Sequence, residues 1–580
     1  MTLNEALAII NSRQGGRKGG TYFLVCGFEP LHLASFFQAR LLERLPADPG
    51  VEVQRGTYGD LQGNLEAARL SSAVAAAAVV EWSDVDPRLG LRSSGGWSNH
   101  AKADLASSCS ASFGRLETAI VALAGRMPVA VAPPSLPLPP IGHTIRAQSS
   151  EFELELRRQL ADFLRRISRA SGVRVLERSV VQTTAPCLDA RMELLAGFPY
   201  SIPFASALAG ALVNVLCQPV PKKGLITDLD GTLWSGIAGE CGPDGVAWSL
   251  EGHAQAHGLY QQMLGHLAGC GVLLGVCSKN EEATAEAVLA RKDLFLDPES
   301  FFPICANWGP KSASVTRVLK AWNVAADSVV FVDDNPMELD EVGRIHQGLT
   351  CLRFPAKDPA AVWRLLGDLR DLFGKPSLSV EDDLRTASIR AAMPIQQTAA
   401  PAGSPDHLTT LQGAVTLAWC AEPADLRPLE LINKTNQFNL NGARITEGEW
   451  RRLLERRDTL LGVVSYEDKF GPLGKIAVVI GRRDGASVRV SHWVMSCRAF
   501  SRRIEHHTID GLLRHTGAAE VELAFAATGR NQPLLEFLRA VGAGPGPDGS
   551  CRISRAGFES SCGALPHQIK TQSGRDAKGK

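Results

Sequence analysis

The chain has 580 residues, of which 45% are hydrophobic and 21% charged, and its 61 Lys and Arg residues balance its 61 Asp and Glu residues. The length alone suggests about four domains, and the composition along the chain fits three better. Because the balanced charge provides no global field for nucleic acid or an acidic membrane, we expect a small-molecule or protein partner.

The amino terminus and the apolar runs bear on localisation. Residues 1–5 lack a basic region followed by an apolar core and a cleavage site. The longest apolar runs, residues 73–80 and 204–217, are too short to span a bilayer. We therefore expect a soluble, cytoplasmic protein.

The 13 cysteines form an odd set without a Cys-x-x-Cys pair, which favours reduced thiols, most of them buried, over a disulfide framework.

The amino-terminal region has an α/β pattern. Residues 21–27 predict a buried strand, residues 31–45 a helix, and residues 51–54 and 73–80 two further strands. The last strand ends on the polar cluster 81–88, a common place for a site in an α/β sheet, although a loop of solvated turn residues fits it equally well. No serine nucleophile follows the first strand, so we do not expect ester hydrolysis here.

Two carboxylates follow a short apolar run in the middle of the chain. Asp228 and Asp230 lie on the same side of an extended backbone, and the bend at residues 231–232 lets both face a ligand beyond the carboxyl end of the strand. A turn rich in Asp and Gly that closes a strand is the alternative interpretation of this pair alone.

Two further strands are predicted to end on polar side chains. Residues 271–277 form an apolar run that ends on Ser278, and the helix predicted over 281–289 has its free amides near that serine. The run 328–332 ends on Asp333. Three strand ends therefore converge. Taken singly, Ser278 is as well explained as a helix cap.

Lys311 completes a set with a specific chemical interpretation. Carboxylates of Asp228 and Asp333, with a main-chain oxygen of Asp230, supply the hard oxygen ligands that Mg²⁺ prefers. Ser278 and Lys311 would hold phosphoryl oxygens, although a lone lysine is as often a solvated surface residue. Asp228 would attack phosphorus in line while Asp230 serves as general acid and base.

The order of these motifs resembles that of the haloacid dehalogenase (HAD) superfamily of phosphatases and phosphotransferases. The matching segments are Asp-x-Asp-x-Thr at 228–232, Ser-Lys-Asn at 278–280, Lys311 and Asp-Asp at 333–334. A closer resemblance, from about residue 56 to about residue 543, is to the FkbH-like proteins of polyketide biosynthesis in HAD subfamily IIIC. It rests on residues 58–61, 81–84, 199–201, 228–240, 257–262, 277–280, 308–311 and 331–336. The chain departs from the usual pattern at Gly231, where Asn or Asp is common, and at 241–244.

This resemblance implies an activity, a cofactor and a partner. FkbH-like proteins are implied to take the glyceryl unit of 1,3-bisphosphoglycerate, remove its phosphate, and load glyceryl as a thioester on an acyl carrier protein. The implied catalytic carboxylates are Asp228 and Asp230, and the implied cofactor is Mg²⁺, held at Asp228, Asp230 and Asp333. The implied phosphate-binding positions are Thr232, Ser278, Asn280 and Lys311.

The carboxyl-terminal region has a different pattern. Residues 376–410 are rich in Pro, Ser, Thr and Ala and predict a linker. Strands predicted near 460–466, 474–481 and 487–493 indicate a mainly antiparallel α+β module. This module resembles acyltransferases of the GNAT fold, and its Ser-Cys-Arg segment at 496–498 matches a motif of the FkbH-like proteins.

Cys497 is the predicted acyl acceptor. A thiol next to arginines and near a helix start should have a lowered pKa and can attack an acyl phosphate. A buried core thiol is the alternative. Residues 501–503, Ser-Arg-Arg, stand where Gly-Arg-Gly is usual in the family, which bears on the local backbone path. Cys277 is the competing nucleophile, although its place at the end of a buried strand favours packing.

We therefore predict a multidomain α/β protein with three folded units. They are an α/β domain (1–220), for which the resemblance to FkbH-like proteins implies an SGNH-hydrolase-like fold, a HAD-like Rossmannoid domain (221–375) and, after the linker, a GNAT-like α+β domain with a disordered tail (411–580). Glyceryl loading is the predicted function. The alternatives are a magnesium-dependent phosphatase for a small phosphate ester and a non-catalytic carrier-protein scaffold. The sequence leaves open the identity of the carrier, the choice between glyceryl and a relative such as lactyl, and the oligomeric state.

Overall fold

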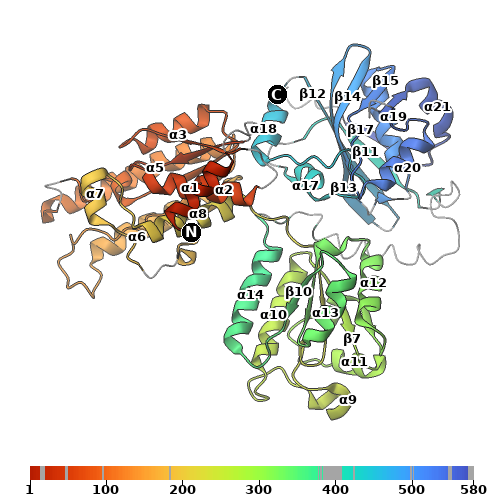
Figure 1. Ribbon diagram of the computed structural model, residues 1–580, viewed down its shortest axis with the longest axis horizontal. Coiled ribbons are helices and arrows are strands. Elements are labelled where there is room, and N and C mark those ends of the chain that lie inside the picture. Colours follow the sequence, from red (N-terminus) through yellow and green to blue (C-terminus); the bar gives the residue numbers. More distant parts are fainter. Residues whose placement is uncertain are drawn as a thin grey trace. The chain divides into compact units, whose positions relative to one another are not determined.

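The computed structural model groups the chain into two compact units (Figure 1). The first contains Met1–Gln218 and Ile445–Arg456, and the second contains Pro219–Arg444 and Arg457–Lys580. The structure describes residues 1–13, 20–45, 50–93, 97–181, 185–376, 378, 382, 408–409, 411–421, 425–456, 458–469, 471–496, 499–500, 502–546 and 551–572.

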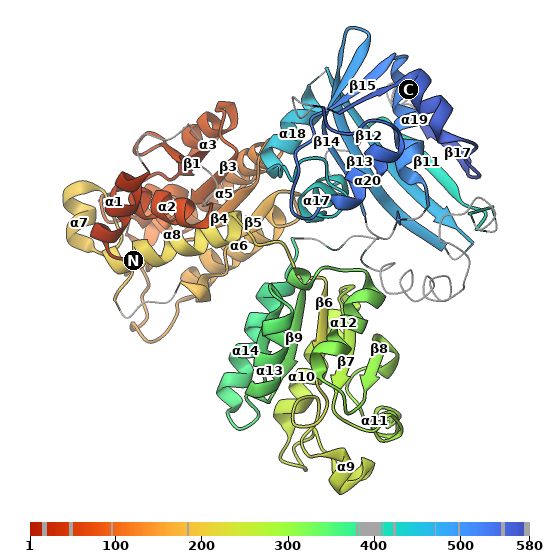
Figure 2. The ribbon, with the colours of Figure 1, turned by 45° about the vertical axis from the view of Figure 1, so that its right-hand side comes forward.

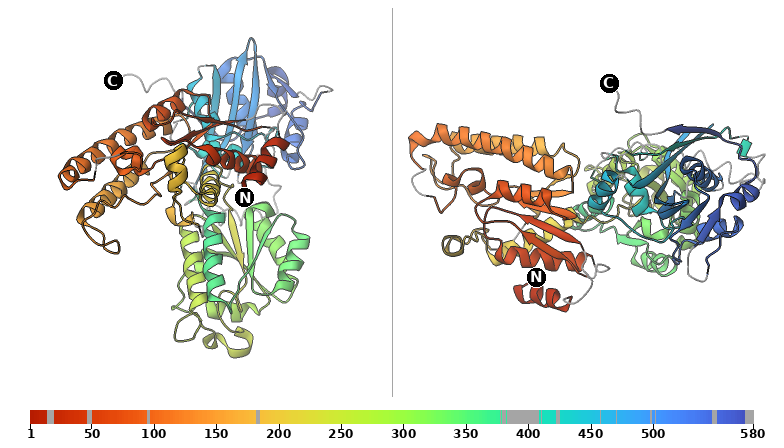
Figure 3. Two further views of the ribbon diagram at one scale, coloured as in Figure 1. Left: turned by 60° about the vertical axis from the view of Figure 1, so that its left-hand side comes forward. Right: turned by 90° about the horizontal axis from the view of Figure 1, so that it is seen from above.

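The first unit contains a parallel five-stranded sheet. Its strand order is β2-β1-β3-β4-β5, formed by β1 (Thr21–Val25), β2 (Glu52–Arg55), β3 (Ala75–Val79), β4 (Val129–Ala132) and β5 (Val173–Val175). The view from above in Figure 3 shows helices on both sides of this sheet. They are α1 (Leu3–Ser12), α2 (Leu31–Arg44), α3 (Leu61–Leu70), α4 (Trp82–Val85), α5 (Lys102–Ala124), α6 (Glu151–Ile167), α7 (Ala190–Ala196) and α8 (Ile202–Leu216).

Alternate residues of each strand face opposite helix layers. On β3, Ala75, Ala77 and Val79 belong to the core shared with α1, α2 and α8. Ala76 and Ala78 belong to the core shared with α3, α5 and α6. Because a strand buried on both faces is apolar throughout, it forms a continuous hydrophobic run, and the strands and helix predicted in the first 80 residues are confirmed.

A segment from the carboxyl-terminal part of the sequence belongs to the first unit. Its helix α18 (Glu447–Glu455) begins at a capping box formed by Thr446 and Glu449. The Glu447 carboxylate lies 2.9 Å from Arg174 and 2.7 Å from Arg451, and all three side chains are largely buried. Gly448 packs so closely that a Cβ there would lie 2.3 Å from the carbonyl oxygen of Val74. One helix of the predicted 411–580 region therefore belongs to the first unit.

The second unit contains another parallel sheet, of order β10-β9-β6-β7-β8 (Figure 2). Its strands are β6 (Gly224–Thr227), β7 (Leu273–Ser278), β8 (Phe301–Ala306), β9 (Val329–Asp333) and β10 (Thr350–Arg353). The associated helices are α9 (Ala238–Cys241), α10 (Gln255–Gly269), α11 (Glu282–Leu289), α12 (Lys311–Trp322), α13 (Pro336–Ile345) and α14 (Pro359–Phe373).

Two cores cover the two faces of this sheet. Leu225 of β6 and Val330 of β9 pack with α10, α11 and α14. Their neighbours Ile226 and Phe331 face the other way and pack with α12 and α13. The strands predicted before Ser278 and Asp333 and the helix predicted over 281–289 are confirmed, and the sheet has the doubly wound form expected of a Rossmann-like domain.

The second unit also contains a mixed seven-stranded sheet of order β16-β15-β14-β13-β12-β11-β17. Its central strands pair antiparallel, whereas β14 with β15 and β11 with β17 pair parallel. The strands are β11 (Ala414–Ala418), β12 (Thr459–Asp468), β13 (Gly471–Asp484), β14 (Ser487–Met495), β15 (Glu520–Leu523), β16 (Cys551–Ser554) and β17 (Gln568–Gln572). The helices are α17 (Arg427–Lys434), α19 (Ile504–Thr516), α20 (Gln532–Ala540) and α21 (Arg555–Cys562).

Three predictions fall wholly or partly outside the part of the chain that the structure describes. Cys497 lies outside it, as does the carboxyl-terminal tail from residue 573. Within the predicted linker 376–410, the described residues are 376, 378, 382, 408 and 409. Among the described helices, none combines the length and the apolar character needed to cross a membrane.

Candidate phosphate and metal site

Three neighbouring strands of the second sheet end on the predicted polar residues. Strand β6 lies between β9 and β7, and Thr227 is in register with Val332 on one side and Val276 on the other. Because all three strands are parallel, their carboxyl ends meet at one edge of the sheet. Asp228, Ser278 and Asp333 therefore lie at the same edge.

An acidic cluster occupies this edge. Asp228, Asp333 and Asp334 each offer a carboxylate oxygen, and these oxygens lie within 4.8 Å of one another. Asp228 and Asp333 are buried and Asp334 is half-buried. Of the predicted metal positions, the structure thus brings Asp228 and Asp333 together, and it adds Asp334. The sequence signal for Asp334 is its position in the Asp-Asp motif.

The side chain of Asp230 points to a different set of partners. Its Oδ1 accepts hydrogen bonds from the Trp234 indole at 2.7 Å and from the Ala238 amide at 3.1 Å. Its Oδ2 accepts one from Asn280 Nδ2 at 3.0 Å. The Asp230 carboxylate is therefore not one of the three clustered groups, which agrees with an expected metal contact through its main-chain oxygen only. Asn280, predicted to bind phosphate, orients Asp230 here.

Lys311 is buried between two of the clustered carboxylates. Its Nζ lies 2.6 Å from Asp333 Oδ2 and 3.0 Å from Asp228 Oδ1, and the lysine is 4% exposed. Lys311 is the first residue of α12, so the start of that helix sets its position. The sequence predicts that Lys311 holds phosphoryl oxygens, and in the structure its ammonium pairs with two aspartates and offsets part of their charge.

The electrostatics of the cluster follow from burial and from this lysine. Burial, opposed by Lys311 and reinforced by Asp333, raises the pKa of Asp228 to about 6. Burial also raises the pKa of Asp333, again against Lys311. For Lys311, burial acts to lower the pKa, but the two carboxylates outweigh it and raise the pKa above its ordinary value. Crowded buried carboxylates of this kind favour occupation by a cation.

Thr232 and Ser278 have different roles in the structure. Thr232 is buried, and its hydroxyl accepts a hydrogen bond from the Asp334 amide at 3.0 Å, which ties the β6 turn to the end of β9. His257 Nδ1 lies 2.9 Å from the Thr232 carbonyl oxygen. Ser278 is the last residue of β7 and is 3% exposed. Thr232 therefore supports the acidic cluster, whereas Ser278 lies at the sheet edge next to Asp228.

Glu338 was not predicted from the sequence. It lies in the first turn of α13. Its carboxylate is 2.8 Å from Lys279 Nζ and 3.9 Å from Lys311 Nζ, so it links the Ser-Lys-Asn segment to the buried lysine. Acidic residues are common in the first turn of a helix because they interact favourably with the helix dipole. The sequence therefore did not mark Glu338 as a residue of the site.

The residues present fit a Mg²⁺ ion. Magnesium prefers hard oxygen ligands and is bound in proteins through a few carboxylates, with water and substrate phosphate completing its shell. Asp228, Asp333 and Asp334 supply such oxygens from the ends of two neighbouring strands, β6 and β9, at one sheet edge. These three residues would hold the ion.

One described residue after position 497 has a backbone conformation that favours glycine. Arg503, which stands at a glycine position of the Gly-Arg-Gly pattern, has φ 54° and precedes α19. Glycine adopts this left-handed conformation without the strain that other residues incur. The Arg503 side chain donates to the carbonyl oxygens of Cys562 and Ala564, which offsets part of that strain. Arg502 is paired with Asp468 at 3.4 Å.

Cys277, the competing nucleophile, is fully buried on β7 opposite Cys305. Burial raises the pKa of its thiol well above the ordinary value. A thiol that stays protonated and excluded from solvent is a poor nucleophile, so the packing role expected for Cys277 is the one that its surroundings support.

Comparisons with known proteins add the following. No family model and no curated protein matches the chain. Among solved structures, the chain is similar to the N-terminal part of the protein BF1531 from Bacteroides fragilis, which contains a phosphatase domain complexed with Mg. The identity is 21% over 65% of this chain and 100% of that one, with a TM-score of 0.49. A protein of Mesorhizobium loti described as a HAD-like phosphatase, mll2559, is 15% identical over 27% of this chain and 90% of its own, with a TM-score of 0.21. Because both TM-scores are below 0.5, the functional argument rests on the site itself.

Proposed function

We propose that the β6–β10 part of the chain is a magnesium-dependent phosphatase or phosphotransferase domain of the haloacid dehalogenase type. The observation that carries this proposal is the cluster of Asp228, Asp333 and Asp334 with Lys311 at the carboxyl edge of a parallel sheet. A strand-closing turn would account for one Asp-x-Asp, but it gives no reason for three carboxylates and a lysine, drawn from three separate segments, to be buried together.

The residues have distinct roles in phosphoryl transfer. Bound Mg²⁺ would neutralise charge on the transferring phosphoryl group. Asp228 attacks phosphorus, so a bond between its carboxylate oxygen and phosphorus forms as the bond to the leaving oxygen breaks. That oxygen departs with the bonding electron pair and takes a proton from Asp230. Asp230 then removes a proton from the water that attacks the aspartyl phosphate, which releases phosphate and restores Asp228. Lys311 and Ser278 stabilise the phosphoryl oxygens.

The finer proposal is that the whole chain loads a glyceryl unit onto an acyl carrier protein. Its support is the motif-by-motif resemblance to FkbH-like proteins, including SGNH-like and GNAT-like regions on either side of the phosphate site. In this scheme the Cys497 thiolate attacks the acyl carbon of 1,3-bisphosphoglycerate. A carbon–sulfur bond forms, the carbon–oxygen bond to the acyl phosphate breaks, and inorganic phosphate leaves with the electron pair. Asp228 then removes the remaining phosphate ester.

Intact-mass measurement after exposure of the full chain to 1,3-bisphosphoglycerate tests this proposal. The wild-type protein should acquire a glyceryl adduct. Asp228→Asn should instead retain a phosphoglyceryl thioester, heavier by one phosphoryl group, because the ester phosphate is no longer removed. Cys497→Ala should acquire no acyl adduct, yet still release phosphate from a small phosphate ester.

Each other outcome points to a different function. Phosphate release from small esters with no adduct on any variant would favour the magnesium-dependent phosphatase. This alternative is supported by the phosphate site, which contains its set of residues without Cys497. A Cys497→Ala protein that still loads its carrier at the wild-type rate would exclude Cys497 as the acceptor. If neither phosphate release nor an adduct is detected, the non-catalytic carrier-protein scaffold is the hypothesis that remains.

A further inference from the structure

The first unit has a cavity of about 390 Å³ at the carboxyl ends of its parallel strands. Because the strand order is β2-β1-β3-β4-β5, the connection after β1 leads to one side of that strand and β3 pairs on the other side. Open α/β sheets commonly bind ligands at such a point, where neighbouring connections diverge. Gly27, Tyr58 and Asp84 line the cavity from the segments that follow β1, β2 and β3. The polar cluster 81–88 thus borders a cavity of the size that small-molecule sites have.

Buried hydrogen bonds hold one wall of this cavity in place. Asn64 is 3% exposed, and its Nδ2 donates to the carbonyl oxygens of Cys26 at 2.9 Å and Thr57 at 2.7 Å. Its Oδ1 accepts from the Thr57 amide at 2.7 Å. The Gly59 amide donates to the Gly27 carbonyl oxygen, also at 2.7 Å. The segments after β1 and β2 are therefore joined to each other, and the wall is largely preformed.

The carboxyl group of Asp84 lies against the end of β1. A Cβ on Gly27 would be 1.8 Å from Asp84 Oδ1, so the glycine leaves room for this carboxyl group. Asp84 Oδ2 accepts a hydrogen bond from the Glu81 amide at 2.8 Å, whereas Oδ1 accepts none from the described residues. The neighbouring Glu81 carboxylate is fully buried and accepts from the hydroxyls of Ser135 and Tyr200, each at 2.6 Å. Glu81 is therefore satisfied within the fold, and Asp84 keeps an unused acceptor at the cavity.

The electrostatics around Asp84 favour a cation. Burial, opposed by the Glu81 amide and reinforced by the carboxylates of Glu81 and Glu193, raises the pKa of Asp84 to about 7. Glu193 also lines the cavity, and its Oε2 is buried without a hydrogen-bond partner in the part of the chain that the structure describes. Burial raises the pKa of Glu193, and Arg92 opposes that change. A cation beside the two carboxyl groups would stabilise their charged forms.

The two arginines that line the cavity do not supply this cation. Arg92 donates to the main-chain oxygen of Glu193 at 3.0 Å, and Arg115 donates to the Ser112 hydroxyl at 2.9 Å. Both arginine side chains are exposed, so water and salt screen their charge. The acceptors of Asp84 and Glu193 at the cavity are therefore left for a ligand.

The set of acceptors indicates an organic cation rather than a metal ion. Among the described residues, the acidic cluster of the phosphate site is the one group of three or more side chains placed to hold a metal ion. Asp84 and Glu193 thus have no third side-chain ligand beside them. An ammonium group needs only hydrogen-bond acceptors, and charged acceptors suit it best. Leu61 and Leu116 also line the cavity and provide apolar contacts for the carbon atoms of such a ligand.

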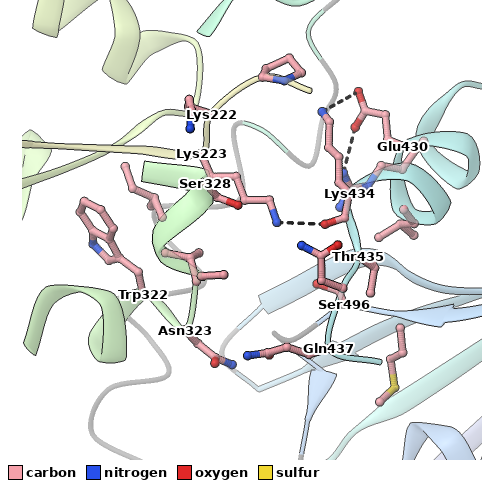
Figure 4. Close-up of a pocket in the computed structure, with 18 of the residues that line it drawn as sticks. Lys222, Lys223, Trp322, Asn323, Ser328, Glu430, Lys434, Thr435, Gln437 and Ser496 are labelled. Atoms are coloured by element: carbon pink, nitrogen blue, oxygen red, sulfur yellow. Dashed lines mark hydrogen bonds and ion pairs between the residues drawn. The ribbon is translucent and has the colours of Figure 1, made fainter. Parts of the chain in front are cut away.

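A cavity in the second unit, shown in Figure 4, differs in both size and charge pairing. Its volume is about 90 Å³. The Glu430 carboxylate at this cavity is paired with Arg427 at 3.0 Å and Lys434 at 3.5 Å. The Lys223 ammonium donates to the main-chain oxygen of Lys434 at 3.4 Å. This smaller cavity therefore offers a ligand neither the space nor the open acceptors of the cavity in the first unit.

We propose that the cavity at the ends of β1 and β3 binds a small molecule through an ammonium group, with the carboxyl groups of Asp84 and Glu193 as its acceptors. This site goes beyond the proposed function, because it requires neither the magnesium cluster nor Cys497. It gives the first unit a ligand-binding role that is independent of phosphoryl transfer.

Calorimetric titration of the full chain with putrescine and with 1,4-butanediol tests this proposal. The two probes share a four-carbon chain and differ in having ammonium or hydroxyl groups at its ends. Excess Mg²⁺ in the buffer occupies the acidic cluster of the phosphate site, so that the diamine does not bind there. We expect putrescine to bind about tenfold or more tightly than the diol, because charge-assisted hydrogen bonds are stronger than neutral ones.

Two variants each remove the charge of one acceptor. Asp84→Asn and Glu193→Gln should each weaken putrescine binding about tenfold and leave the affinity for the diol unchanged. Glu193→Gln leaves the contact between Asp84 and the Glu81 amide intact, so it tests the site even if Asp84→Asn unfolds the first unit. The control is Glu52→Gln, which removes an exposed carboxylate of β2 outside the cavity and should bind putrescine like the wild type.

Several outcomes would overturn the assignment. They are equal affinities for the two probes, no binding of either probe, and wild-type putrescine affinity in the folded Asp84 and Glu193 variants. An equal loss of affinity in Glu52→Gln would show general attraction to an acidic surface and would also overturn it. Phosphate release plays no part in these measurements, so the proposal can fail without affecting the proposed function.

Discussion

Gly231 determines how closely the Asp334 carboxylate approaches the β6 turn. Its φ of 71° is in the left-handed region, and a Cβ at this position would lie 2.7 Å from Asp334 Oδ2. Asn tolerates the left-handed backbone better than most residues, which fits its occurrence at this position in the FkbH-like proteins that the sequence resembles. An Asn at position 231 would still bring a Cβ close to the Asp334 carboxylate. Gly231 therefore leaves room for Asp334 that an Asn would not.

Gly231→Ala should therefore weaken magnesium binding. The added Cβ strains the backbone and displaces the Asp334 carboxylate, and a change next to a metal ligand typically costs about 10- to 100-fold in metal affinity. The measurement is the Mg²⁺ concentration that gives half-maximal phosphate release.

Gly348→Ala is the matched control for that variant. Gly348 also has a positive φ, 91°, but its nearest neighbours are atoms of Asp327 rather than of the cluster. The Gly348→Ala variant should lose about as much stability as Gly231→Ala but keep the wild-type magnesium requirement. If the two variants had equal magnesium requirements, Asp334 would not be a ligand.

At the scale of elements, α19 is joined to the chain before β17 by two buried histidines. His507 Nε2 lies 2.9 Å from His567 Nδ1, and the outward ring nitrogens have no hydrogen-bond partner among the described residues. Burial lowers the pKa of His507 to about 3, with His567, His506 and Arg503 adding to the effect. The folded state therefore holds His507 neutral.

This pair predicts a loss of stability in acid. An unfolded histidine takes up a proton near pH 6.5, whereas folded His507 does so only near pH 3, so the unfolded state binds the extra proton between these values. The contribution of neutral His507 to the free energy of unfolding should be complete above about pH 6.5. Below that pH it should fall by up to roughly 1.4 kcal/mol per pH unit. Hydrogen exchange of the α19 amides as a function of pH measures this.

Two variants isolate the contribution of His507. His507→Gln should flatten the pH dependence of α19 exchange. His515→Gln, which changes an exposed histidine of the same helix, should leave most of it in place. An unchanged pH profile in His507→Gln would show that His507 does not drive the acid sensitivity.

Much of the second sheet could be predicted because its strands are buried on both faces and end on side chains of matching chemistry. The run before Asp333 is apolar at each position for that reason, and its parallel neighbour places Asp228 beside it. The orientation of Asp230 could not be predicted in the same way. Trp234 and Asn280, which hold it, are distributed over a turn and a different strand end. Side-chain direction after a turn depends on such tertiary contacts.

At the scale of the whole molecule, the order of elements along the sequence does not indicate that residues 445–456 belong to the first unit. Helix α18 lies between elements of the mixed sheet in sequence, yet the buried ion pair of Glu447 with Arg174 places it in the first unit. An amphipathic helix pattern shows that one face is buried but not which core it joins. A local pattern of this kind can predict a helix but cannot assign it to one of the two units.

The most direct test of the account is phosphate release from p-nitrophenyl phosphate by the purified full chain. We predict release that requires Mg²⁺, stops in excess chelator and returns when magnesium is restored. Asp228→Asn should lower the rate at least roughly a thousandfold while circular dichroism stays unchanged, because the variant loses the attacking carboxylate and keeps its shape. Release by Asp228→Asn at the wild-type rate, or full activity in excess chelator, would contradict the assignment of this site.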